Sequence, residues 1–272
     1  MVEGNAVEWK ITARVTGRFR LFIYGLRRRL GARKITIRTN WGSMLEVFFT
    51  DVSAFPMYFG NYEEQETQKI VKNVTRGMTA FDIGAHMGYF TLLMAELVGP
   101  NGCVFAFEPN PIMYSRLRSN IALNPQLEDG RVKTFPVALG KEKGLSSFFC
   151  PILGHEGVGG LKDVQRAPVS KRIHVDVDTL DSIIIKHNIK RLDFLKIDVE
   201  GGEYDIFKGS EYVLRELRPT ILFEACELNT DPYGYRVFEE LHYLEQRGYK
   251  VKQAGFSYNF VAVPTSKNEN SS

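Results

Sequence analysis

Three acidic residues in the second half of the chain stand where a substrate or a metal ion could be held. Asp198 lies at the end of the strand-like run 192–199, Glu200 comes two residues later, and Glu224 follows the strand-like run 220–223. Ligands of a parallel sheet bind beyond the carboxyl ends of its strands, so we expect these carboxylates to converge on one crevice. One carboxylate could act as a general base, while another anchors a positively charged group of a ligand. Alternatively, the three could hold a divalent cation, which prefers oxygen ligands.

A glycine-bearing turn in the first half of the chain predicts a nucleotide site. Asp82 lies near the end of the strand-like run 79–83, and Gly84 and Gly88 follow it before a helical stretch. Glycine carries no β-carbon, so the backbone can turn sharply there and approach a ligand closely. About twenty residues further on, Glu108 follows the strand-like run 103–107, a position from which a carboxylate accepts hydrogen bonds from ribose hydroxyls.

The spacing of these glycines distinguishes between adenosine cofactors. A dinucleotide-binding turn has the pattern G-x-G-x-x-G, whereas the pattern here is G-x-x-x-G. An NAD-dependent oxidoreductase is therefore disfavoured. The remaining alternative to a cofactor turn is a tight packing turn with no ligand.

Alternating strand-like and helical stretches are expected to position these residues. The strand-like runs are 79–83, 103–107, 132–139, 192–199, 220–223, 250–253 and 260–263, and the helical stretches are 63–73, 90–98, 111–123, 204–217 and 236–247. This alternation predicts an α/β fold with a mostly parallel sheet covered on both faces. The short turn between the last two runs predicts an antiparallel pair at one edge.

Two further hairpins are predicted outside this alternation. The runs 35–38 and 44–49 are joined by a short glycine-containing loop and form the first hairpin. The runs 146–150 and 171–177 flank a loop over 151–169 that is rich in glycine, proline and charge. A loop of this length within a compact domain is often functional.

Composition fits a globular protein with an uneven charge distribution. Of the 272 residues, 44% are apolar and 25% charged, and the three cysteines show no ligand spacing, so neither a zinc site nor a disulfide framework is indicated. Residues 1–34 carry nine basic residues against two acidic ones, a net charge of +7, whereas the rest of the chain is −4. The longest uncharged apolar stretch of this segment, 21–26, is far too short to span a bilayer, and no signal-peptide pattern is present.

These observations divide the chain into a basic N-terminal arm (1–33), a catalytic domain (34–264) and a polar, disordered tail (265–272). The arm has two interpretations. It is either a solvated helix packed on the main domain or an interfacial helix that contacts anionic membrane, since its basic residues are interleaved with apolar ones. The expected location is cytoplasmic, with peripheral membrane contact under the second interpretation.

Three stretches resemble the FkbM family of methyltransferases. Residues 82–91 resemble its cofactor loop D-[IV]-G-A-N-x-G-x-x-[ST], 105–109 resemble its ribose-binding acid, and 195–203 match its distinctive L-K-I-D-V-E-G-x-E. The resemblance covers about 35–263 and leaves the basic arm outside. One departure is His86, which stands where the family commonly has Asn. We interpret His86 as a cofactor-loop contact rather than a catalytic base.

The resemblance implies the Rossmann-like class I methyltransferase fold, a seven-stranded sheet whose last strand inserts antiparallel. It also implies S-adenosylmethionine as methyl donor and O-methylation of a hydroxyl on a sugar, glycan or other small molecule. The expected catalytic residues, which are also the candidate metal ligands, are Asp198, Glu200 and Glu224. The expected cofactor-binding residues are Tyr62, Glu63, Asp82, Gly84, Ala85, His86, Gly88, Thr91, Glu108 and Ala138.

Two other functions remain alternatives at this point. The basic arm is compatible with an RNA methyltransferase, although no RNA-binding module is recognisable and the rest of the chain is acidic, so nucleic acid is not the expected partner. A Rossmann-like protein that binds a nucleotide without catalysis is the second, and the presence of Asp198 argues against it.

Overall fold

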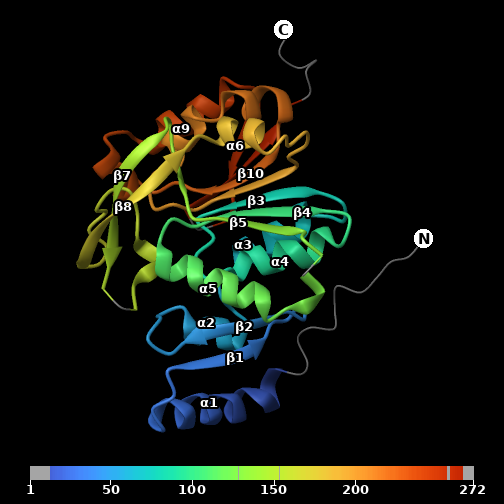
Figure 1. Ribbon diagram of the computed structural model, residues 1–272, viewed down its shortest axis with the longest axis vertical. Helices are drawn as coiled ribbons and strands as arrows, with labels where there is room; N and C mark the ends of the chain where they lie inside the picture. Colours follow the sequence, from blue (N-terminus) through green and yellow to red (C-terminus); the bar gives the residue numbers. More distant parts are fainter. Residues whose placement is uncertain (1–12, 128, 153, 256–257, 266–272) are drawn as a thin grey trace.

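The computed structural model describes residues 13–127, 129–152, 154–255 and 258–265. Among these residues the largest sheet has seven strands, in the order β11, β12, β10, β9, β3, β4, β5 (Figure 1). Their bounds are β3 Thr79–Ile83, β4 Cys103–Phe107, β5 Val132–Phe135, β9 Phe194–Ile197, β10 Thr220–Glu224, β11 Tyr249–Gln253 and β12 Asn259–Pro264. Strand β12 runs antiparallel to both of its neighbours, and the other pairings in this sheet are parallel. The class I methyltransferase sheet expected from the sequence is confirmed.

Helices cover both faces of this sheet, so its central strands are mainly apolar, with Asp82 on β3 and Lys196 on β9 as buried charged residues. On one face, side chains such as Ala80 pack against α3 (Glu64–Asn73), α4 (Tyr89–Val98) and the N-terminal segment. On the other face, side chains such as Phe81 pack against α6 (Leu180–Lys186), α7 (Glu203–Lys208) and α9 (Val237–Glu245). Ala80 and Phe81 serve opposite faces because successive strand residues point to opposite sides.

The N-terminal hairpin is present as predicted and packs on the edge of the main domain. It comprises β1 (Lys34–Arg38) and β2 (Met44–Phe48), with α1 (Ala13–Arg29) before it and α2 (Ala54–Phe59) after it. Helix α5 (Pro111–Ala122) and the turn that follows hold β2, because Asn120 and Asn124 each accept a hydrogen bond from its backbone at 2.7 Å. The predictions for residues 1–12 and for the tail 266–272 lie outside the described residues.

The inserted hairpin is also present and forms a separate small sheet. It contains β6 (Ala138–Leu139), β7 (Gly144–Pro151) and β8 (Val169–Asp178), in the order β6, β8, β7. The strand predicted over 132–139, with an interruption at Pro136, is two strands that belong to different sheets. Strand β5 ends before Pro136, which has no N–H to continue a ladder, and β6 pairs in the other sheet.

The prediction of one helix over 204–217 is wrong. Helix α7 ends at Lys208, and a π-helical turn over Val213–Leu217 follows it. The break lies at Gly209, where a β-carbon would come within 2.1 Å of the Gly140 carbonyl oxygen. The short helices α2, α6 and α8 (Glu227–Thr230) were not predicted.

Candidate active site

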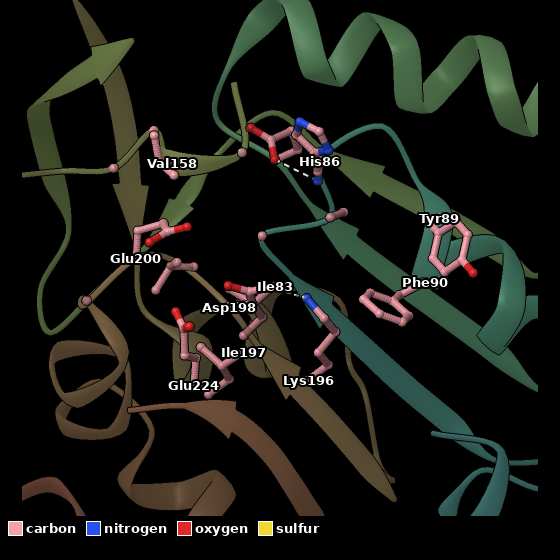
Figure 2. A pocket seen from close by; sticks show the side chains of 18 of the residues that line it. Ile83, His86, Tyr89, Phe90, Val158, Lys196, Ile197, Asp198, Glu200 and Glu224 are labelled. Carbon is pink, nitrogen blue, oxygen red and sulfur yellow. Dashed lines mark hydrogen bonds and ion pairs between the residues drawn. The ribbon is translucent and has the colours of Figure 1, made fainter. Parts of the chain in front are cut away.

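A cavity of about 560 Å³ lies at the carboxyl ends of the central strands, a size typical of small-molecule sites (Figure 2). Strands β3, β4, β9 and β10 each end at its wall. Helix α2 contributes Pro56 and Met57, and the inserted hairpin contributes part of its loop. The cavity therefore unites the two regions that the sequence singled out, the glycine turn and the three acidic residues.

The glycine turn after β3 is wedged between the ends of two neighbouring strands. The N–H groups of Gly84 and Ala85 donate to the Phe107 carbonyl oxygen at 3.0 and 2.9 Å. On the other side, a β-carbon on residue 84 would lie 1.8 Å from the Asp198 carbonyl oxygen. Gly84 also has a φ of +81°, a conformation that favours glycine. No other residue type fits at this position.

The Glu108 carboxylate is held rigidly at the end of β4. Its Oε2 accepts the His86 N–H and its Oε1 accepts the Asn110 N–H, both at 2.8 Å. Burial raises the pKa of Glu108 to about 7, although the two N–H groups favour the charged form. Each oxygen keeps acceptor capacity, and the residue lines the cavity, so the carboxylate can receive ribose hydroxyls.

Seven of the ten residues expected to bind the cofactor line the cavity, namely Tyr62, Glu63, Gly84, Ala85, His86, Glu108 and Ala138. The other three, Asp82, Gly88 and Thr91, are not in the wall. The Thr91 hydroxyl donates to Asp82 Oδ2 at 2.6 Å in the interior. Gly88 precedes α4, and a β-carbon there would come within 2.7 Å of Leu117. These three residues lie on the side of the turn that faces the interior of the protein, and they stabilise the turn without lining the cavity.

A buried lysine connects the two halves of the site. Lys196 on β9 stands opposite Asp82 in the β3–β9 register, and its Nζ lies 3.7 Å from Asp82 Oδ1 and 3.3 Å from Asp198 Oδ2. Burial alone would lower the pKa of Lys196. The negative charges of Asp198, Asp82 and Glu63 outweigh burial and hold its pKa above the ordinary value. Lys196 is therefore a permanent cation in the wall of the cavity.

The three acidic residues converge as expected. One oxygen each of Asp198, Glu200 and Glu224 lie within 4.8 Å of one another, and Figure 2 shows the side chains pointing into one region of the cavity. Burial, together with the charge of Asp198, raises the pKa values of Glu200 and Glu224. Like charges at this separation cannot all ionise easily, so the cluster retains protons at neutral pH.

Two partners of this cluster were not predicted from the sequence. Arg166 Nη1 lies 2.6 Å from Glu200 Oε2, and Asn229 Nδ2 donates to Glu200 at 3.0 Å and to Glu224 at 3.1 Å. Arg166 belongs to the loop over 151–169, whose length predicts a functional role. No local sequence pattern distinguishes Arg166 from its neighbours in that loop. Asn229 lies on α8, a helix that the sequence did not predict.

The carboxylate oxygens of the cluster are suitable ligands for a divalent cation, but two basic side chains already neutralise part of the cluster's negative charge. Arg166 pairs with Glu200, and Lys196 pairs with Asp198. These two cations reduce the negative potential that would attract a metal ion.

Glu203, the last acid of the 195–203 motif, does not belong to the cluster. It is buried at the start of α7, where its carboxylate accepts the Val199 N–H at 2.9 Å and so stabilises the start of the helix.

Comparison with known proteins places this site in a family. The sequence profile described as Methyltransferase FkbM domain matches residues 82–251. Methyltransferase 1 of Beauveria bassiana (strain ARSEF 2860) is 29% identical over 55% of this chain and 65% of that protein. The 31-O-demethyl-FK506 methyltransferase FkbM of Streptomyces tacrolimicus is 30% identical over 50% of this chain and 60% of that protein. The chain thus matches less than two thirds of the length of each of these relatives.

Among solved structures, Methyltransferase FkbM from Methylobacillus flagellatus KT is 13% identical and aligns with a TM-score of 0.49. The alignment covers 94% of this chain and 62% of that one.

Proposed function

Because the chain belongs to the FkbM family of S-adenosylmethionine-dependent methyltransferases, we propose that it methylates a hydroxyl oxygen of a small-molecule or glycan acceptor. The observation that carries the proposal is the position of Asp198. Its backbone packs against the cofactor turn at Gly84, and its carboxylate belongs to the acidic cluster. The residue therefore stands between the half of the cavity that suits a nucleoside and the half that suits an acceptor.

The cofactor half is built from rigid groups that orient the methyl donor. Glu108 accepts the ribose hydroxyls, and Ala138 lies in the adjoining wall. Tyr62 and Glu63 line the same cavity and would hold the methionine part of the cofactor. When bound, S-adenosylmethionine supplies a methyl group on a positively charged sulfur. The residues of the chain hold the acceptor in line with that methyl group and exclude water.

Asp198 is the proposed general base. A neutral alcohol is a poor nucleophile, and a positioned carboxylate that removes its proton contributes typically 10²- to 10⁴-fold in rate. Asp198 would accept the proton of the acceptor hydroxyl as its oxygen takes the methyl group that bound S-adenosylmethionine would supply. Lys196, 3.3 Å from Asp198 Oδ2, holds that carboxylate in place.

Glu200 and Glu224 are the proposed acceptor-binding residues. Carboxyl groups accept hydrogen bonds from hydroxyls, and Asn229 fixes both side chains. The name of the Streptomyces relative specifies an O-demethyl substrate, which supports oxygen as the acceptor atom.

The test is an acceptor screen with methyl-labelled S-adenosylmethionine. Sugars, glycans and other alcohols are incubated with the protein, and both S-adenosylhomocysteine and labelled product are followed by mass spectrometry. We expect label in an ether bond. Failure of S-adenosylmethionine to bind in calorimetry would overturn the proposal, and so would transfer confined to nitrogen or to RNA.

A further inference from the structure

Helix α1 carries a surface that the proposed reaction does not use. The helix lies at one end of the molecule, outside the β1–β2 hairpin and away from the seven-stranded sheet (Figure 1). It is held there by Tyr24, whose ring lies 4.8 Å from that of Phe49, 5.6 Å from that of Phe55 and 5.1 Å from that of Tyr58. Tyr24 is buried, so one face of α1 is anchored to the domain.

Within residues 21–29 of α1, the face opposite Tyr24 carries exposed apolar side chains. Residues four and three apart share a helix face, so Phe22, Leu26 and Arg29 lie together, turned away from Tyr24. Phe22 is 61% exposed and Leu26 39%, and Leu30 just after the helix is 76% exposed. Large apolar side chains gathered in this way usually mark an interaction site.

The charges around this face indicate which partner it meets. Arg27, Arg28 and Arg29 form the last turn of α1, with Arg33 just beyond, and all four side chains are exposed. No acidic residue lies between positions 21 and 34. A helix with basic residues beside exposed Phe and Leu suits the boundary between anionic headgroups and acyl chains. No described helix is long and apolar enough to cross a bilayer.

We propose that α1 docks this protein on anionic membrane, with Phe22, Leu26 and Leu30 entering the interface and the arginines binding lipid phosphates. Helix α2 lies between the docked surface and the cavity. Helix α2 contacts Tyr24 through Phe55 and Tyr58, and it lines the cavity through Pro56 and Met57. Docking therefore holds the active site close to the bilayer, and it does not depend on the identity of the acceptor.

Vesicle sedimentation of the full chain tests this proposal. We expect binding to phosphatidylcholine vesicles that contain phosphatidylglycerol, weak binding to phosphatidylcholine alone, and loss of binding as salt is raised. The double variant F22S/L26S should bind at least about tenfold more weakly, since two apolar side chains no longer enter the interface. The matched control is I185S/L228S, which alters two exposed apolar side chains on α6 and α8.

A second variant and two further measurements keep the outcome decisive. R27Q/R28Q/R29Q should lose most of the lipid-charge dependence while its apolar face is intact. Thermal unfolding of each variant verifies its fold, and S-adenosylmethionine calorimetry reports separately on the proposed function. Docking is overturned if the wild type does not sediment with anionic vesicles. It is also overturned if gel filtration shows a dimer that F22S/L26S converts to a monomer, since a second copy then covers this face.

Discussion

The carbonyl oxygen of Asp198 occupies the space into which a β-carbon on residue 84 would project, 1.8 Å away. The cofactor turn and the proposed base are therefore in direct contact, but through the main chain of Asp198. Its side chain is separate and points into the acidic cluster (Figure 2). A change of the Asp198 side chain should thus affect catalysis without disturbing the cofactor turn.

Replacement of Asp198 by Asn should separate binding from turnover. The variant keeps the backbone contact with Gly84 but cannot accept the acceptor's proton, so we expect kcat to fall about 10²- to 10⁴-fold. Its dissociation constant for S-adenosylhomocysteine, which has no positive charge on sulfur, should stay within about threefold of the wild-type value, because the contacts of the cofactor turn are unchanged. Steady-state kinetics measures kcat, and calorimetry measures the dissociation constant. Asp205→Asn on α7, outside the cavity, is the matched control. Unchanged kcat in D198N would remove Asp198 as the base.

Replacement of Glu108 by Ala should weaken S-adenosylmethionine binding about 10- to 100-fold, the usual effect of losing hydrogen bonds to a charged group. The variant also leaves the His86 and Asn110 N–H groups without their acceptor. Calorimetry measures the loss, and Glu142→Ala at an exposed position should bind as the wild type does. An equal loss in both variants would indicate a non-specific charge effect instead of a ribose contact.

Binding of S-adenosylmethionine should strengthen as the pH rises. Burial, together with the charge of Asp198, raises the pKa of Glu63 to about 7 and that of Glu200 to about 8. As pH passes through this range the carboxyls lose protons, the cavity becomes more negative, and a cationic sulfonium is better stabilised. We expect a gain of about tenfold, equivalent to one pKa unit.

S-adenosylhomocysteine is the control for this pH dependence. It carries the same amino and carboxyl groups but no positive charge on sulfur, so its gain over the same pH range should be smaller. Identical pH dependence for the two ligands would show that the cavity carboxyls do not interact with the sulfonium.

Replacement of Glu240 by Gln should stabilise the protein at alkaline pH. Glu240 on α9 is fully buried, neither carboxyl oxygen has a hydrogen-bond partner among the described residues, and burial raises its pKa from 4.5 to about 8. Between these two values the folded state binds a proton that the unfolded state does not. Stability therefore falls as pH rises through this window, by on the order of 1 kcal/mol per pH unit.

Denaturant unfolding at several pH values measures this effect. Glu240→Gln should flatten the decline, whereas Glu245→Gln, exposed on the same helix, should follow the wild type. A decline of equal slope in Glu240→Gln would assign the pH dependence to other groups, of which Glu203 is the first to test because burial and Glu240 raise its pKa as well.

Much of the fold was predictable because its signals are local. The runs that became β3, β4, β9 and β10 are mainly apolar because both faces of these strands are covered, and a glycine turn or an acidic residue marks the end of each. The glycine turn and Glu108 were found by spacing alone, since a sharp turn after a strand needs residues without a β-carbon.

The partners of these groups were decided by tertiary structure. Lys196 meets Asp82 because the register of β9 on β3 places them side by side, and no local pattern encodes that register. Arg166 meets Glu200 across 34 residues because the inserted hairpin folds back over the cavity. Asn229 joins Glu200 to Glu224 from a four-residue helix too short to show a periodicity. The sequence by itself determined which chemical groups follow the strands. Packing between distant segments determined which of these groups are paired, buried or charged.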